Sequence, residues 1–130
     1  MLAVVGAGHR LAGRPAIALA ELAADPWMAP SRDGLVVAAC RAAGFEPRLV
    51  LVVRDPLAVR ALAAAGIAVT LTPQLLARLA LPGVANIALE GPAPRRRLYA
   101  LLPPAGAHPG AIAMVEALRA ASVSEAPRAA

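Results

Sequence analysis

Apolar residues along this chain follow two alternating patterns. Short, nearly continuous apolar runs are typical of strands, whereas longer stretches with apolar residues at helical spacing are typical of helices. Gly and Pro separate most of these segments, as they do at turns. The patterns predict strands over residues 2–5, 27–29, 48–53, 67–71, 84–89 and 98–102, a helical turn or two over 19–24, and helices over 32–43, 56–65, 73–81 and 109–121.

Capping residues support the two central helices of this prediction. Ser31 and Asp55 stand where an N-cap side chain accepts a hydrogen bond from the first helical turn, and Pro56 suits the first helical position. Gly44 and Gly66 stand where helices commonly end in the left-handed conformation. The sequence therefore predicts sharp ends for both helices.

The order of the predicted elements favours an α/β fold. Strands separated by helices of about ten residues predict βαβ units, a mostly parallel sheet and right-handed crossovers. The continuous apolar run over residues 48–53 is typical of a strand buried on both faces. The chain has 130 residues, enough for one domain, and its core must rely on Ala, Val, Leu and Ile because Phe, Trp and Tyr occur once each. Trp27 is predicted in that core, and Phe45 beneath the turn after a helix.

The charge pattern gives little support for nucleic-acid binding. The chain has 13 arginines, no lysine and 8 acidic residues, for a net charge of +5. The arginines are scattered, and almost no aromatic residues lie between them, unlike a typical nucleic-acid surface. The one run, Arg95 to Arg97, is interpreted as a solvated loop, with a nucleic-acid surface as the alternative.

Candidate reactive groups are few. Cys40 is the only cysteine, which excludes an intrachain disulfide and a multi-cysteine zinc site, and its spacing from Val36 predicts a buried helix face. His9 and His108 lack further ligands at metal-binding spacing, so surface or capping roles are expected. We therefore expect no metal, no cofactor and no catalytic constellation. No targeting segment or membrane span is predicted, which favours a cytoplasmic protein without a membrane partner.

The segment "VVGAGHRLAG" suggests dinucleotide binding, because a predicted strand leads into Gly6-x-Gly8. That function needs a third Gly or Ala three residues later, where this chain has Leu11, and an uninterrupted helix, where it has Pro15. An NAD(P)-binding enzyme therefore stays only as an alternative to a strand followed by an irregular loop.

Several segments resemble, in order, the effector-binding domain of LysR-type bacterial transcription regulators. Each motif is weak alone, and the order and spacing across nearly the whole chain make the resemblance specific. One departure is Ala68, which replaces the second Gly of the family's Gly-x-Gly pair. The segments are "GHRLAG" (8–13), "LAELAADPWMAPS" (19–31), "CRAAGFEPRLVLVVRD" (40–55), "VRALAAAGIAVTLTPQLLA" (59–77) and "RRRLYALLPPAGAHPGAIAMVEALRAA" (95–121).

The resemblance implies a periplasmic-binding-protein-like (type 2) α/β fold, in which two subdomains joined by crossing strands enclose a cleft. It implies a crossing strand and loop over residues 1–14, one complete second subdomain over 15–86, closing elements of the first subdomain over 87–121, and a flexible tail over 122–130. The helix-turn-helix and the first half of the effector domain are expected to be missing. DNA contact would come only through that missing N-terminal domain.

The resemblance also implies a site, because ligands of such folds bind beyond the carboxyl ends of the strands. For each candidate residue, capping of the following helix is an alternative to ligand contact. The residues implied at the cleft rim are Ser31, Arg32, Arg54, Asp55, Gly66, Thr70 and Thr72.

Two further hypotheses about function follow. By resemblance, the chain is a sensing module for a small organic anion, within a homo-oligomeric regulator that is not an enzyme. Alternatively, it is a stand-alone α/β interaction protein that dimerises through the bare edges of strands 84–89 and 98–102.

Overall fold

The structure is a computed structural model that describes residues 1–78, 81–91, 94–95 and 97–124. The chain divides into two compact units, Met1–Arg96 and Arg97–Ala130. The second unit contains the helix α4 (Pro109–Ser124). The first unit contains β1 (Leu2–Gly6), β2 (Ala16–Ile17), the short 3₁₀ helix η1 (Leu19–Leu22), β3 (Pro26–Ala29), α1 (Leu35–Ala42), β4 (Arg48–Val52), α2 (Pro56–Ala64), β5 (Thr70–Thr72), α3 (Gln74–Ala77) and β6 (Val84–Leu89).

The strand β1 lies between β6 and β5 in a four-stranded sheet with the order β2-β6-β1-β5. It runs antiparallel to both neighbours, with Leu2 opposite Thr72 and Ala3 opposite Ile87. β3 and β4 form a parallel pair, and a parallel bridge from Trp27 to Val69 joins this pair to the segment that leads into β5. The sheet is therefore mixed, and the prediction of a mostly parallel sheet is wrong for β1.

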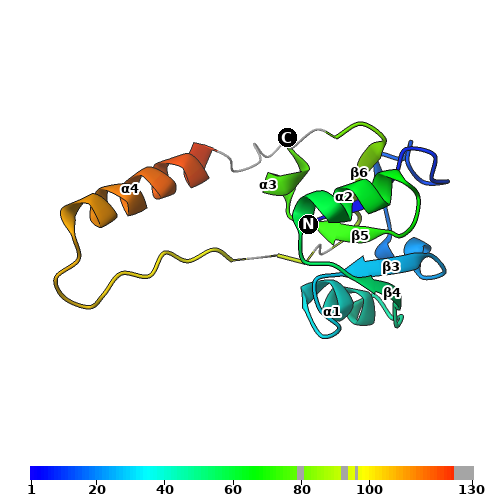
Figure 1. The fold of residues 1–130 in the computed structure, drawn as a ribbon, viewed down its shortest axis with the longest axis horizontal. Coiled ribbons are helices and arrows are strands. Elements are labelled where there is room, and N and C mark those ends of the chain that lie inside the picture. Colours follow the sequence, from blue (N-terminus) through cyan, green and yellow to red (C-terminus); the bar gives the residue numbers. More distant parts are fainter. Residues whose placement is uncertain (79–80, 92–93, 96, 125–130) are drawn as a thin grey trace. The chain divides into compact units, whose positions relative to one another are not determined.

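Alternate positions of the strands enter two separate hydrophobic clusters. Val4 packs with Met28 and with Ala63 of α2 on one face. Ala3 belongs to a larger cluster on the other face, where Trp27 is fully buried and α1 supplies part of the packing. This alternation follows from the two-residue period of a strand, and it explains why α1 and α2 lie on opposite sides of the strands (Figure 1).

The predicted core residues lie where they were expected. The indole Nε1 of Trp27 donates a 3.0 Å hydrogen bond to the Leu22 carbonyl, and its ring centroid lies 5.8 Å from that of half-buried Phe45. Cys40 is fully buried on α1 beside Val36. A single tryptophan thus joins η1, β3 and the turn after α1.

The predicted ends of α2 are confirmed. The Asp55 carboxylate accepts a 2.7 Å hydrogen bond from the Ala58 backbone N–H, and Pro56 occupies the first helical position. Gly66 closes the helix with φ of +70° and Gly44 follows α1 with φ of +88°, both in the left-handed region that favours glycine.

The predicted start of α1 is wrong. The helix begins at Leu35 with Gly34 as the N-cap residue, so Ser31 is not the cap. A Cβ atom at position 34 would lie 2.5 Å from Ser31 Oγ. The chain makes three further residues of loop after Ser31, and the Ser31 hydroxyl lies over Gly34 instead of bonding to the first turn.

The prediction that the 48–53 strand is buried on both faces is also wrong. β4 pairs with β3 on one side and has no partner on the other among the described residues. Arg48, Val50 and Val52 are exposed, and the residues between them are half-buried. The apolar run reflects an edge strand with one apolar face exposed, not a central strand.

The residues after β6 differ from the prediction as well. β6 pairs with β1 through Val84–Ile87 and with β2 only at Ala88 and Leu89, so much of its edge on the β2 side has no paired strand among the described residues. Residues 98–102 do not form a strand. Arg95 and Arg97 are exposed in an irregular segment, as a solvated loop requires, and Arg96 lies outside the described residues.

The last helix begins at Pro109, as predicted, and extends to Ser124. His108 precedes it, and its Nδ1 accepts a 3.1 Å hydrogen bond from the Gly110 backbone N–H, which is the predicted capping role. Of the predicted tail, residues 122–124 belong to α4 and residues 125–130 lie outside the described residues. None of the described helices has the length and apolar character needed to cross a membrane.

Candidate functional site

The carboxyl ends of β3, β4 and β5 meet at one edge of the first unit, which we call the carboxyl edge. β3 and β4 are parallel, and the parallel bridge from Trp27 to Val69 gives β5 the same direction. Ser31, Arg54 and Pro73 follow the three strands there. Met1 lies at the same edge, because antiparallel β1 begins opposite Thr72.

Two hollows open along the carboxyl edge. The first, which we call the Ser31 hollow, has a volume of about 400 Å³. Its walls are largely apolar. Among the lining residues, only Ser31 has a polar side chain. The lining residues are Met1, Pro30, Ser31, Gly34, Leu35, Val36, Leu71 and Pro73.

The second, which we call the Arg60 hollow, has a volume of about 190 Å³. Pro30, Leu71 and Pro73 line both hollows, so the two are neighbours. The hollow lies between β5 and the first half of α2, and two arginines and two threonines line it. The full lining is Val4, Pro30, Val53, Arg54, Pro56, Leu57, Val59, Arg60, Thr70, Leu71, Thr72, Pro73 and Leu76.

Arg60 is the residue that sequence reasoning missed. It lies on α2 with 2% of its surface exposed, on the same helix face as buried Ala63. Its Nη1 donates to Asn86 Oδ1 at 3.4 Å, while its Nε and Nη2 have no hydrogen-bond partner among the described residues. Its spacing could have indicated this burial, because Arg60 lies one turn before Ala63 on the apolar stripe of the helix.

The structure brings several of the predicted rim residues together. Ser31 lies in one hollow, and Arg54, Thr70 and Thr72 lie in the other. Asp55 stands between β4 and α2, where its carboxylate is engaged as the helix cap. Arg32 is exposed and lines neither hollow.

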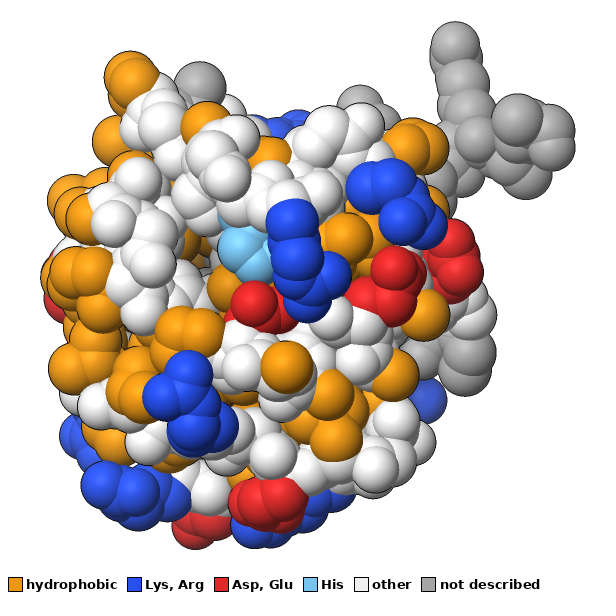
Figure 2. All heavy atoms as spheres, turned by 90° about the vertical axis from the view of Figure 1, so that its right-hand side faces the viewer, with side chains coloured by type: hydrophobic (Ala, Val, Ile, Leu, Met, Phe, Trp, Pro, Cys, Tyr) orange, Lys and Arg blue, Asp and Glu red, His pale blue; other side chains and the backbone are white. Residues whose placement is uncertain are grey.

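Gly66 lies elsewhere. It precedes β5, so it belongs to the opposite edge of the strands, in a hollow of about 550 Å³ that Gly6 and Gly8 also line. His9 lies in this hollow with its Nε2 3.2 Å from the Asp25 carboxylate, and Arg10 binds the same carboxylate at 2.8 Å. Figure 2 shows this face, on which a histidine lies among arginines and acidic side chains.

The His9 ring has a structural role at that face. Its Nδ1 accepts a hydrogen bond from the Leu11 backbone N–H at 3.2 Å, which leaves Nε2 to face Asp25. The ring therefore closes the turn after β1, in agreement with the predicted capping role.

The Gly6-x-Gly8 segment does not form a dinucleotide site in the described residues. β1 ends at Gly6, and residues 7–13 form turns where the phosphate-binding helix would begin. A Cβ atom at Gly6 would lie 2.7 Å from the Ala63 carbonyl oxygen, whereas one at Gly8 would meet nothing within 4 Å. Gly6 thus allows the end of β1 to approach α2 closely.

The Cys40 thiol is unsuited to nucleophilic chemistry. Burial, and secondarily the negative charge of Glu46, raises the pKa of Cys40 from 9.0 to about 12. The thiol is therefore protonated at neutral pH and inert. No group of three or more His, Cys, Asp or Glu side chains within the described residues is arranged to hold a metal ion.

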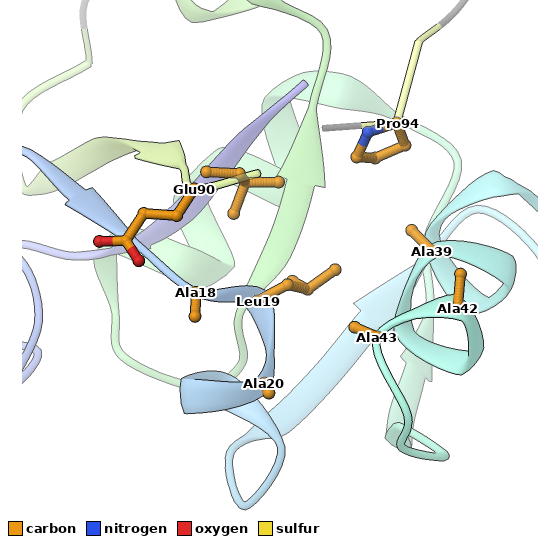
Figure 3. A pocket seen from close by; sticks show the side chains of 9 residues that line it. Ala18, Leu19, Ala20, Ala39, Ala42, Ala43, Glu90 and Pro94 are labelled. Atoms are coloured by element: carbon orange, nitrogen blue, oxygen red, sulfur yellow. The ribbon is translucent and has the colours of Figure 1, made fainter. Parts of the chain in front are cut away.

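A fourth hollow of about 400 Å³ lies between η1 and α1. Figure 3 shows that Leu19 extends from η1 toward the alanines of α1. Ala39, Ala42 and Ala43 line that side, and Glu90 is the charged lining residue. The groove offers packing surface and no convergent polar groups, so it is a weak candidate for specific ligand binding.

Comparison with known proteins gives a consistent result. The profile of the LysR substrate binding domain matches residues 1–122. Three similar solved structures are the effector binding domain of QuiR in complex with shikimate (18% identity, TM-score 0.65, 92% of this chain and 59% of that chain), the C-terminal domain of a probable LysR family regulator from Rhodococcus sp. RHA1 (27%, 0.56, 72% and 49%) and the BenM effector binding domain with benzoate (20%, 0.56, 70% and 45%).

The chain spans about half the length of these related structures, between 45% and 59%. Among curated proteins, none matches the chain. Residues 1–122 cover most of the chain, and the neighbours share its mixed α/β fold.

The fold is that of a periplasmic-binding-protein-like (type 2) effector-binding domain. The chain belongs to the LysR substrate-binding domain family.

Proposed function

We propose that this chain is an effector-sensing module of a LysR-type transcription regulator and that its carboxyl edge forms one wall of the effector cleft. The observation that carries this proposal is the convergence of Ser31, Arg54 and Thr72 at one edge, where three strands end. Helix and strand ends supply free polar groups at that edge, which is where α/β folds bind ligands. Residues 15–86 would be one subdomain, and residues 87–121 would return to the other.

The proposed ligand is a small organic anion. Two arginines and three hydroxyl groups line the two hollows, and no acidic residue is among the lining residues. The Ser31 hollow has apolar walls that suit a small carbon skeleton. Two of the similar structures were determined with benzoate and with shikimate, which are ligands of this chemical class.

The proposed mechanism is a shift between open and closed clefts. Ligand held between two walls favours the closed state only to the extent that it binds that state more tightly. About 1.4 kcal/mol of differential binding shifts the ratio of the two states tenfold. In the cytoplasmic parent regulator, which we propose to be a homodimer and not an enzyme, that shift would alter DNA binding through a helix-turn-helix domain.

A thermal unfolding assay tests the proposal. Benzoate, shikimate and related small carboxylates are added separately, and at least one should raise the unfolding midpoint saturably, because a ligand of the folded state stabilises it by mass action. The neutral amide of that carboxylate should not. Ser31→Ala and Arg54→Gln should each reduce the rise.

Arg48→Gln is the matched control, because Arg48 is an exposed arginine at the start of β4, away from the carboxyl edge. It should leave the rise unchanged. If every carboxylate fails, or if the Arg54→Gln and Arg48→Gln variants respond alike, the proposed site is wrong.

A second candidate function is association through β4. The strand has no partner on its outer side among the described residues, and Val50 and Val52 are 42% and 45% exposed. Such an edge recruits another strand. We expect Val50→Lys to weaken self-association in sedimentation velocity, and Leu75→Lys on α3, which is 56% exposed, to leave it unchanged. A wild-type chain that stays monomeric at high concentration would contradict this candidate.

A further inference from the structure

The Arg60 guanidinium is buried and forms no ion pair within the part of the chain that the structure describes. Arg60 has 2% of its surface exposed, and its described hydrogen-bond partner is the neutral Asn86 amide, at the long distance of 3.4 Å. Its Nε and Nη2 are buried and make no hydrogen bond to any residue that the structure describes. Arginine stays protonated in proteins, so a full positive charge lies in the first unit with two unused donors.

We propose that Arg60, with Thr70 and Thr72, forms a subsite that binds the carboxylate of the effector. This inference rests on the proposed function, and it assigns the anion to a particular pocket and a particular side chain. It places the charge recognition on α2, behind the rim residues that follow the strands.

The geometry of the free donors suits a carboxylate. Nε–H and Nη2–H point from the same side of the planar guanidinium and form one of its two-pronged edges. Both nitrogens are themselves buried, so the proposal requires this edge to turn toward the hollow that Arg60 lines. A carboxylate can then accept both at once, and such bidentate pairs are stronger and more directional than single hydrogen bonds. Asn86 binds the remaining nitrogen, Nη1, so it holds the group without using this edge.

The surroundings of Arg60 favour an anion. Thr70 and Thr72 lie two positions apart on β5, so they share a strand face, and both line the Arg60 hollow. Arg54 lines it as well, and α2 begins there at Pro56. None of the lining residues is acidic, and the Asp55 carboxylate is already bonded to the Ala58 N–H.

The size of the hollow indicates how much of the ligand it takes. A volume of about 190 Å³ accommodates a carboxylate and a few further atoms, and is smaller than the pockets that enclose a whole drug-sized ligand. Pro30, Leu71 and Pro73 continue the wall into the apolar Ser31 hollow. The carboxylate would therefore enter the Arg60 hollow while the carbon skeleton lies in the Ser31 hollow.

Stability alone does not account for Arg60. An unpaired buried charge destabilises a fold, and an apolar residue of similar length at that helix position would avoid the cost. The competing explanation is that Arg60 ties α2 to β6 through Asn86. The two explanations predict opposite results for Arg60→Met.

The test follows the arginine Nε–H signals of the ¹⁵N-labelled chain by NMR during a titration with sodium acetate, at an ionic strength held constant with sodium chloride. The Arg60 signal is assigned by its absence from the Arg60→Lys variant. We expect it to move saturably with acetate. Thr72→Val should weaken acetate binding roughly tenfold, because a hydrogen bond to a charged group is lost.

Arg60→Met should abolish acetate binding while keeping or raising the thermal unfolding midpoint. A lower unfolding midpoint for Arg60→Met than for the wild type would overturn the inference. So would an Arg60 NMR signal that does not move with acetate, or that moves no more than it does with chloride. Arg48→Gln should bind acetate as the wild type does.

The same variants separate the two proposals. If a larger carboxylate stabilises the wild type and Arg60→Met equally, the effector role stands and the Arg60 subsite is wrong. If acetate moves the Arg60 signal but no larger carboxylate stabilises the chain, the anion subsite stands and the effector role falls.

Discussion

The Asp55 carboxylate accepts a 2.7 Å hydrogen bond from the backbone N–H of Ala58, which fixes the first turn of α2 at the carboxyl edge. The bond satisfies one of the N–H groups that a helix leaves free at its start. It also engages the acidic side chain that stands closest in sequence to Arg54. Asp55 thus caps the helix, and its carboxylate is not among the groups that line the Arg60 hollow, where Arg54 and Arg60 supply positive charge.

Removing this cap should destabilise the fold. We expect Asp55→Ala to lower the free energy of unfolding by about 1 kcal/mol, since an N-cap hydrogen bond is lost, and Asp55→Asn to keep most of it. Urea denaturation followed by circular dichroism measures both. Asp33→Ala, at an exposed loop position, should change little. Equal effects at positions 55 and 33 would contradict the capping role.

Trp27 should be the most sensitive core position. Its side chain is fully buried, and its indole N–H donates to the Leu22 carbonyl. Trp27→Phe removes one of the two hydrogen bonds that this carbonyl accepts, since the Asp25 backbone N–H still donates to it at 3.1 Å. The change also opens a small cavity, at an expected cost of about 1–3 kcal/mol in the free energy of unfolding. Tyr99→Phe, at a position 74% exposed, should be nearly neutral in the same urea denaturation. A neutral Trp27→Phe variant would show that the bond adds nothing.

Cys40 should make stability depend on pH in the alkaline range. Its pKa is raised from 9.0 to about 12, chiefly by burial, so the folded state holds the thiol proton more tightly than the unfolded state. The resulting stabilisation is fully present below pH 9 and is lost as the pH rises through 12. The difference in unfolding free energy between the wild type and Cys40→Ala should shrink over that range.

The same burial predicts the reactivity of the thiol. At pH 8, the native chain should react with a thiol reagent far more slowly than the chain unfolded in urea. Comparable rates in the two states would show that the thiol is accessible, and would contradict the burial of Cys40.

Gly6 and Gly8 should respond differently to substitution. Gly6→Ala places a Cβ atom 2.7 Å from a backbone oxygen of α2, so the strand or the helix must shift, and we expect a loss of about 1–3 kcal/mol. Gly8→Ala meets no atom within 4 Å and should be nearly neutral. Thermal unfolding of both variants checks this packing role. If NAD(P) raises the unfolding midpoint of the wild type, the packing role of Gly6 is contradicted and the nucleotide-binding hypothesis is supported.

The local features of the fold could be predicted because they depend on neighbours in the sequence. Asp55 and Gly66 mark the ends of α2 through groups within one helical turn. Trp27 and Cys40 are buried because both side chains are largely apolar and lie on apolar faces of their elements, which favours their removal from water. The order of the motifs was enough to place the chain in its family, which the match over residues 1–122 confirms.

The tertiary structure decided the rest, because it depends on residues far apart in sequence. Arg60 is buried against Asn86, 26 positions away, and no local signal shows which residue a helix will meet. Gly66 precedes β5 and Thr72 ends it, so the two residues lie at opposite edges of the strands and line different hollows. Ser31 faces a hollow instead of capping α1, because the helix begins only after Gly34. The sequence by itself determined the ends of α2 and the family, and the pairing of distant strands and helices decided which side chains share a pocket.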